Sequence, residues 1–377
     1  MTEQVIDMPK IHILFRFFRG PWGGGNQFLK ALRTIFKEKG VYAKSLEKAD
    51  VILFNSDKRS LGSLAKELCQ LKFKQNKILI NRIDGPIQLR NNQLAFLDEL
   101  IIRINNLLMD GCVYQSRWAY EGMKKLGGGK ERSRKIIHNA SNKNIFYPSK
   151  TEGRYNNDKI KIIATSWSTN YYIKGFDIYE FLDKNLDFSN YEMTFVGRSP
   201  IKFKSIKHIK PVPSKVLAEI LRQHDIYVTA SINDPCSNAL IEALQCGLPS
   251  VVRNSGGHSE LIKNGGVVFN GQDDVLEKIK KLAENLKFYR NNIPIYDIDV
   301  VGSKYLDFIE EVFNKQLQAS SKLSSYNKRL DCLRLSLIIL KYNISSTIKA
   351  MMWNVKKYAP KFLNYRRPKI WDRLFVL

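Results

Sequence analysis

Short apolar runs recur along the chain, and they alternate with segments in which apolar residues repeat at helical spacing. In the first domain-sized stretch the apolar runs occupy residues 10–15, 51–54, 78–80, 111–114 and 135–138. Runs of this length are typical of buried strands, and the helices between them indicate a parallel sheet that is covered on both faces. The pattern therefore predicts an α/β domain over residues 1–147.

A second series with the same alternation follows a polar stretch. That stretch, residues 148–159, contains Pro, Ser, Gly and Asn and predicts a linker. Beyond it the predicted strands are 160–164, 193–197, 225–230 and 250–252, and the predicted helices lie near 176–182, 215–222, 238–245 and 273–286. The fold class is therefore α/β, with two doubly wound Rossmann-like domains, 1–147 and 160–300, that face a cleft. Such folds bind ligands at the carboxyl ends of their strands.

One of these strand ends carries candidate chemistry. Ser237 comes after the apolar run 225–230 and directly before a helix-forming segment, so it is predicted to be an N-cap. The backbone amides of the next residues, Asn238, Ala239 and Leu240, then lack partners within the helix. Unpaired amides at the positive end of a helix dipole favour the binding of a phosphate.

Two carboxylates flank this helix start. Asp234 lies in the preceding loop, and Glu242 lies eight positions further along the chain. At about 100° per residue, Asn238 and Glu242 fall opposite the apolar face of the helix, toward a cleft or toward solvent. The segment thus combines an anion site with two acids that can bind hydroxyl groups. The pattern alone is equally compatible with a capped surface helix whose Glu242 is solvated.

The residues of 233–244, followed by those of 253–261, resemble the nucleotide-sugar site of retaining GT-B glycosyltransferases of family 4. That site has two acids separated by seven residues and then a Gly-Gly turn; here the first acid is Asp234 instead of Glu. The resemblance spans roughly residues 10–315 and implies a GT-B fold with a nucleotide-sugar donor. It also implies that Asp234 binds hydroxyls of the donor sugar, that Glu242 binds the ribose, and that the amides at the helix start hold the diphosphate.

The resemblance suggests further catalytic and binding residues. Lys174 matches a lysine that neutralises the diphosphate, and Arg198 is a candidate for the arginine that the family places elsewhere. An exposed loop arginine is the alternative interpretation of Arg198. Asp84, just after the run 78–80, is a candidate for binding the acceptor or orienting the donor sugar, and a turn-forming aspartate is its alternative.

Glycines and a histidine complete the predicted site. Gly24 and Gly25, in the Gly-rich turn after the first strand, are expected to approach the donor phosphates. His258 follows the Gly-Gly turn near the donor, and Asn139 resembles the family's strand-end asparagine. Cys236 is interpreted as a small residue that fills the loop, not as a nucleophile. Because no cluster of His, Cys, Asp and Glu has metal-ligand spacing, we expect no metal, and no cofactor besides the nucleotide-sugar substrate.

The charge of the chain points to an anionic partner. The net charge is +25, and residues 320–377 contain 13 Lys or Arg and two acids, with aromatic residues interleaved. This composition is typical of an amphipathic element on an anionic membrane; a basic helix packed on the protein is the alternative. Nucleic acid would also suit the charge, and a Lys-rich composition would produce it without any function. By resemblance, residues 301–319 form a helix that crosses back to the N-terminal domain.

The sequence also leads to expectations about the cellular compartment of the protein and about the reaction that it catalyses. Five cysteines without paired spacing, and no signal peptide, indicate a reducing cytosol. We expect a cytoplasmic enzyme, peripheral on the inner face of the cell membrane, that transfers a sugar to a hydroxyl of a glycan or lipid-linked acceptor with retention of configuration. The alternatives are a GT-B enzyme that glycosylates nucleic acid and a non-catalytic protein that binds sugar nucleotides or polyanions.

Overall fold

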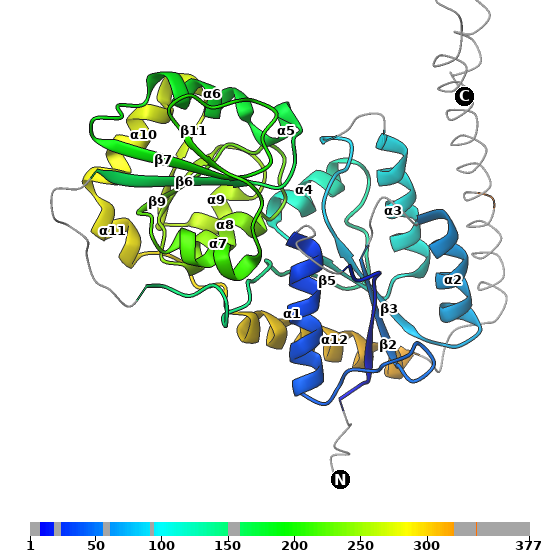
Figure 1. Ribbon diagram of the computed structural model, residues 1–377. Coiled ribbons are helices and arrows are strands. Elements are labelled where there is room, and N and C mark those ends of the chain that lie inside the picture. The colour runs from blue at the N-terminus through cyan, green and yellow to red at the C-terminus, as the bar shows by residue number, and fades with distance from the viewer. Residues whose placement is uncertain are drawn as a thin grey trace, which may run out of the picture.

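The protein folds into two α/β domains that lie side by side (Figure 1). The computed structural model describes residues 8–18, 24–55, 61–90, 94–149 and 159–319, together with Leu337. Apart from that leucine, the predicted basic extension 320–377 lies outside the described residues. Most of the predicted linker 148–159 also lies outside them.

Among the described residues, the N-terminal domain has five parallel strands in the order β1-β2-β3-β4-β5. The strands are β1 Ile11–Leu14, β2 Val51–Asn55, β3 Ile78–Ile83, β4 Gly111–Tyr114 and β5 Arg134–Ile136. The helices are α1 Gly24–Glu38, α2 Leu61–Phe73, α3 Ala95–Leu108 and α4 Arg117–Lys125. Every residue of β2, β3 and β4 is buried, which explains why these strands appear as continuous apolar runs.

The C-terminal domain has a six-stranded parallel sheet in the order β11-β10-β9-β6-β7-β8. Its strands are β6 Ile160–Ser166, β7 Tyr191–Gly197, β8 Lys207–Ile209, β9 Ile226–Thr229, β10 Ser250–Arg253 and β11 Gly266–Phe269. Its helices are α5 Tyr171–Lys174, α6 Phe176–Asn185, α7 Ser214–Leu221, α8 Asn238–Gln245, α9 His258–Ile262, α10 Gln272–Glu284 and α11 Leu286–Asn291. The predicted doubly wound architecture is confirmed. The two edge strands, β8 and β11, were not predicted, because partly exposed edge strands carry less continuous apolar runs.

The helix α12 (Ile298–Ala319) leaves the C-terminal domain and lies along the N-terminal one (Figure 1). It packs on α1, where Tyr305 is fully buried and its ring centroid lies 6.0 Å from that of Phe28. Phe308 and Val312 of α12 belong to the same buried cluster. Residues 301–319, for which the resemblance implied a crossing helix, lie within α12.

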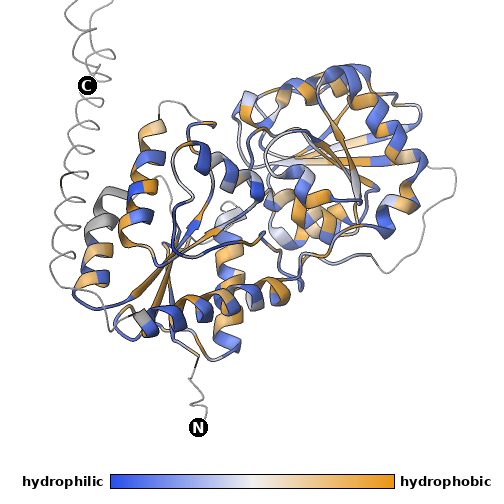
Figure 2. Cartoon of the chain, turned by 180° about the vertical axis from the view of Figure 1, so that it is seen from behind, coloured by the Kyte–Doolittle hydropathy of each residue, from blue (hydrophilic) through white to orange (hydrophobic). Residues whose placement is uncertain are grey.

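One hydrophobic core crosses the domain boundary. Leu240 and Leu244 of α8 share it with Phe28 and Leu32 of α1, whereas two other clusters lie within single domains. Figure 2 shows apolar residues along the strands and polar residues on the outer faces of the helices. The shared core determines where α1 and α8 meet. No helix among the described residues is both long enough and apolar enough to cross a bilayer.

Candidate active site

A cavity of 340 Å³ lies between the domains, at the end of strands β6 and β9. The N-terminal domain contributes Gly24 and Gln27 of α1, and the C-terminal domain contributes the remaining lining. That part of the lining includes Thr165, Ser166, Lys174, Asp234, Asn238 and Glu242. The cavity therefore occupies the carboxyl edge of the second sheet, where doubly wound folds bind ligands.

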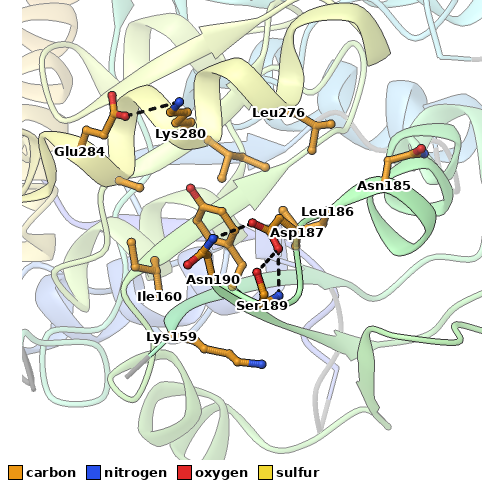
Figure 3. A pocket seen from close by; sticks show the side chains of 13 residues that line it. Lys159, Ile160, Asn185, Leu186, Asp187, Ser189, Asn190, Leu276, Lys280 and Glu284 are labelled. Atoms are coloured by element: carbon orange, nitrogen blue, oxygen red, sulfur yellow. Dashed lines mark hydrogen bonds and ion pairs between the residues drawn. The ribbon is translucent and has the colours of Figure 1, made fainter. Parts of the chain in front are cut away.

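A larger hollow, of 640 Å³, lies at the opposite edge of the same sheet, beside α6 and α10 (Figure 3). Its charged groups already have protein partners. Asp187 accepts hydrogen bonds from Ser189 and Asn190, and Lys280 lies 3.9 Å from Glu284. Because this hollow opens at the amino ends of β6 and β7 and its charges are matched, the cavity between the domains is the candidate site.

The start of α8 supplies backbone donors to this cavity. Ser237 is the N-cap, as predicted, and its hydroxyl accepts a hydrogen bond from the Leu240 amide at 3.4 Å. The Leu240 amide is therefore already occupied, and the Leu240 side chain is buried in the core. The amides of Asn238 and Ala239 have no backbone partner at this helix start, and both residues line the cavity. Two amides, instead of the three expected, are thus without a backbone partner at this helix start.

Asp234 and Lys174 form an ion pair at the edge of the cavity. Lys174 Nζ lies 3.6 Å from Asp234 Oδ2. Burial alone would raise the pKa of Asp234, but nearby positive charges, Lys174 first among them, outweigh burial and hold the pKa below its usual value. The structure therefore brings together two residues that are 60 positions apart in the sequence and keeps Asp234 ionised.

Two glycines allow the loops of this pair to pack closely. Gly175 ends α5 in the left-handed conformation, with φ of 68°, and a Cβ there would lie 2.1 Å from the Ala230 carbonyl oxygen. Gly256, with φ of 66°, would place a Cβ 2.1 Å from the Asp234 carbonyl oxygen. The Gly257 amide donates to that same oxygen at 2.9 Å. Only glycine permits these approaches, so the Gly-Gly turn holds the backbone of Asp234 in place.

Glu242 lies on the side of α8 that faces the cavity, opposite the apolar face of the helix, as its helical phase predicted. Its carboxylate makes no hydrogen bond or ion pair with any described residue. Burial raises the pKa of Glu242 to about 8, with no compensating charge beside it. A carboxylate in this situation favours a ligand that donates hydrogen bonds to it.

Asp84 follows β3 on the N-terminal side of the domain boundary, and it is held by two residues that the sequence did not single out. Arg82 Nη1 lies 3.1 Å from Asp84 Oδ1, and Gln115 Nε2 donates to the same oxygen. Arg82 is almost fully buried, and its Nη2 donates to Asn139 at 2.6 Å. The available sequence signal for Arg82 was a charged residue between Asn81 and Ile83, at the end of an apolar run.

Asn139 connects this network to the loop that contains Asp234. Its backbone amide donates to Cys236 Sγ at 3.3 Å, and its side-chain amide donates to the Cys236 carbonyl at 3.4 Å. Cys236 is buried, and burial raises the pKa of its thiol to about 12. A thiol in that state is a poor nucleophile, which agrees with its interpretation as a residue that fills the loop.

The remaining predicted residues differ in how they relate to the cavity. Gly24 lines it and lies against the Asn238 side chain, whereas Gly25 is not part of the lining. Arg198 is exposed at the end of β7 and does not line the cavity either. His258 is buried and does not line the cavity; its Nδ1 lies 3.2 Å from the Arg253 carbonyl oxygen. The described residues contain no group of His, Cys, Asp and Glu that could hold a metal ion.

Glu260 joins the two domains directly. Its carboxylate accepts hydrogen bonds from the amides of Arg117 and Trp118, both at 2.7 Å, at the amino terminus of α4. His138 Nε2 lies 3.4 Å from the same group. Burial would raise the pKa of Glu260, but these hydrogen bonds outweigh burial and lower it. The sequence showed Glu260 next to the Gly-Gly turn without indicating a partner in the other domain.

Solved structures share this two-domain arrangement. One is HepE from Anabaena in complex with UDP-glucose, matched with a TM-score of 0.57 and 11% identity over 84% of this chain and 100% of that chain. Another is WaaG, described as a glycosyltransferase involved in lipopolysaccharide biosynthesis, with a TM-score of 0.57 and 14% identity over 79% and 99% of the two chains. The fold is GT-B. Likeness at this level of identity concerns the fold alone.

A family model matches a segment of the chain that contains part of the site. Residues 203–294 match the model of the family described as glycosyl transferases group 1. The matched segment contains Asp234, α8 and the Gly-Gly turn, but not Lys174. A curated relative, the probable sucrose-phosphate synthase of Thermosipho melanesiensis, is 24% identical over 317 residues, which cover 75% of this chain and 72% of the relative. The matched segment thus lies in the C-terminal domain, which contributes most of the cavity lining.

Proposed function

We propose that the protein is a retaining glycosyltransferase that transfers a sugar from a nucleotide-sugar donor to a hydroxyl of a glycan or lipid-linked acceptor. The observation that carries the proposal is the cavity between the domains. It combines the amides at the start of α8, the cation of Lys174 and the unpartnered carboxylate of Glu242. The descriptions of HepE name UDP and UDP-glucose as its ligands, which supports a nucleotide-sugar donor.

The donor fits this cavity with its charged part at the helix start. The diphosphate accepts from the amides of Asn238 and Ala239 and lies near Lys174, because a helix amino terminus attracts anions. Glu242 accepts hydrogen bonds from the ribose hydroxyls. Asp234 accepts hydrogen bonds from hydroxyls of the sugar that is transferred. Each group of the donor then meets a protein group of complementary character.

The proposed reaction proceeds on one face of the sugar. The bond from the anomeric carbon to the diphosphate oxygen breaks, and the acceptor oxygen bonds to the same carbon from the same side. The leaving diphosphate takes the acceptor's proton, so no separate protein base is required. Lys174 and the helix amides stabilise the negative charge that develops on the diphosphate, which is the largest contribution expected for this chemistry.

The acceptor is proposed to be a glycan or lipid-linked molecule at the cytoplasmic face of the membrane. The net charge of +25 and the basic, aromatic composition of residues 320–377 support an anionic surface as a partner. WaaG, which shares the fold, is described as acting in lipopolysaccharide biosynthesis. Surface polysaccharide or lipopolysaccharide synthesis is the corresponding role proposed for this chain.

A screen of nucleotide sugars against the wild-type protein and the Glu242→Ala variant tests the proposal. A donor present at 100 times its Kd stabilises the folded state by about 2.7 kcal/mol, or about 3 °C in Tm for a chain of this size. We expect one nucleotide sugar to produce this shift in the wild type. The variant should keep the fold and lose both the shift and sugar transfer.

Glu219→Ala is the matched control, because Glu219 is an exposed acid on α7 in the same domain. It should behave like the wild type in both assays. Absence of a shift with every nucleotide sugar, or unchanged turnover in Glu242→Ala, would contradict the proposed function.

A further inference from the structure

The loop after β3 carries an arginine, Arg90, and the backbone of this loop is fixed from within its own domain. Asp98 of α3 is buried and accepts hydrogen bonds from the amides of Ile87 and Gln88, at 2.8 and 2.9 Å. The Arg90 amide donates to the Ile87 carbonyl at 3.0 Å. A buried carboxylate that accepts hydrogen bonds from two successive amides orders the loop. The backbone from which the Arg90 side chain extends is therefore fixed.

The same loop contacts the Asp234 loop of the other domain. Asn233 Nδ2 donates to the Leu89 carbonyl at 2.7 Å. At the other end of the loop, a Cβ on Gly85 would lie 3.4 Å from the Cβ of Pro235. The contacts on either side of Asp234 therefore reach the loop that carries Arg90. An N-terminal arginine is thereby placed beside the acid of the C-terminal domain.

The Arg90 guanidinium lacks an anchoring partner among the described residues. Its Nε is buried without a hydrogen bond, and the side chain makes no ion pair with a described residue. An unsatisfied buried donor destabilises the folded state, so such a group in a folded protein requires an explanation. Arg82, by contrast, donates through its two Nη atoms to Asp84 and Asn139.

The charge of Arg90 acts on Asp234. After burial, which acts in the opposite direction, Lys174, His258 and Arg90 are the charges that lower the pKa of Asp234. Arg90 does not line the cavity that contains the α8 amides. Lys174 lines the cavity together with Asp234, whereas Arg90 belongs to the N-terminal domain, which faces the transferred sugar and the acceptor in the proposed arrangement.

We propose that Arg90 is a substrate-binding residue that reaches across the domain boundary and donates hydrogen bonds to oxygens of the transferred sugar, opposite Asp234. This inference rests on the proposed function, and it adds a residue of the N-terminal domain to the donor-sugar subsite. A guanidinium presents several donors in a planar fork, which suits two neighbouring sugar oxygens or a carboxylate. Asp234 accepts hydrogen bonds and Arg90 donates them, so together they select the sugar by its pattern of oxygens.

Binding and turnover of Arg90→Gln and Arg90→Lys test this inference. The probes are UDP with UDP-glucose and ADP with ADP-glucose, together with whichever donor the screen identifies and its nucleoside diphosphate. We expect Arg90→Gln to bind the nucleoside diphosphate within about twofold of the wild type and to lose about 10- to 100-fold in kcat/KM for the nucleotide sugar. Arg90→Lys should recover part of that loss, because it retains the charge without the fork.

Arg103→Gln is the charge-matched control, since Arg103 is an exposed arginine of α3 whose partner is Glu99. This variant should change neither the affinity for the nucleoside diphosphate nor kcat/KM for the nucleotide sugar. Equal losses for the nucleoside diphosphate and the nucleotide sugar in Arg90→Gln would make Arg90 a diphosphate ligand and overturn the inference. Unchanged kcat/KM would overturn it as well. A wild type that binds no nucleoside diphosphate would contradict the proposed function itself, so the two failures are distinguishable.

Discussion

Glu242 holds its carboxyl group in a partly buried position without a protein partner, and this has a thermodynamic consequence. Burial raises the pKa of Glu242 from its ordinary value of 4.5 to about 8 in the folded protein. The folded state therefore binds more protons than the unfolded state between these two values. It follows that the contribution of Glu242 to the free energy of unfolding decreases as the pH rises from 4.5 to 8.

The Glu242→Gln variant should expose this effect, because glutamine is neutral at every pH in that window. Its free energy of unfolding should be close to that of the wild type near pH 5. It should exceed the wild-type value by about 2–3 kcal/mol at pH 9, once partial exposure of the group is allowed for. Urea unfolding at the two pH values measures the difference. A gain that is independent of pH would contradict the raised pKa.

At the scale of elements, helices α9 and α4 are joined through Glu260. Its carboxylate occupies the amino terminus of α4, where the first amides lack partners and the helix dipole favours a negative charge. The helix α9 also begins directly after Gly257, whose amide binds the Asp234 carbonyl. The contact between the domains is thus connected to the loop that positions Asp234.

Replacement of Glu260 by Gln should loosen this contact. Glutamine keeps one acceptor oxygen and no charge, so one amide of α4 loses its partner and the variant should be destabilised by about 1–2 kcal/mol. The pKa of Glu260 is lowered in the folded state, so its stabilisation is present above about pH 4.5 and is lost as the pH falls. Urea unfolding at pH 7 and pH 3.5 measures both effects.

Glu99→Gln is the comparison for this experiment, because Glu99 is an exposed acid paired only with Arg103 on the same helix. Exposed pairs of this kind contribute about 0.3–0.5 kcal/mol. If Glu260→Gln were no more destabilising than Glu99→Gln at pH 7, the helix-capping role of Glu260 would be refuted.

At the scale of the whole molecule, the proposed association with a membrane rests on charge. The net charge is +25, and residues 320–377 hold 13 basic residues against two acids. Lys and Arg near an anionic bilayer contribute about 1 kcal/mol each, and salt screens this attraction. We expect the full chain to sediment with vesicles that contain anionic lipid, but not with neutral ones.

A chain that ends at residue 319 provides the test of this role, because α12 ends there. It should bind anionic vesicles at least about tenfold more weakly than the full chain, and 0.5 M salt should weaken the full chain similarly. Equal vesicle binding by the two chains would refute the role of residues 320–377. Salt-sensitive binding to duplex DNA, without binding to vesicles, would favour the nucleic acid alternative.

The sequence by itself determined the local features of this protein. Runs of apolar residues identified the central strands, because a strand buried on both faces must be apolar throughout. Helical phase and N-cap preference placed Ser237 and Glu242 at the start of α8, since both depend only on neighbouring positions. The doubly wound fold class followed from the order of these elements.

Only the tertiary structure decided which groups meet. The pairing of Asp234 with Lys174, the capping of α4 by Glu260 and the position of Arg90 beside Asp234 join residues that are far apart in the chain. The raised pKa of Glu242 likewise depends on surroundings that form only when the domains pack. The physical reason is that burial and charge act through space, whereas periodicity and capping act between neighbours in the sequence.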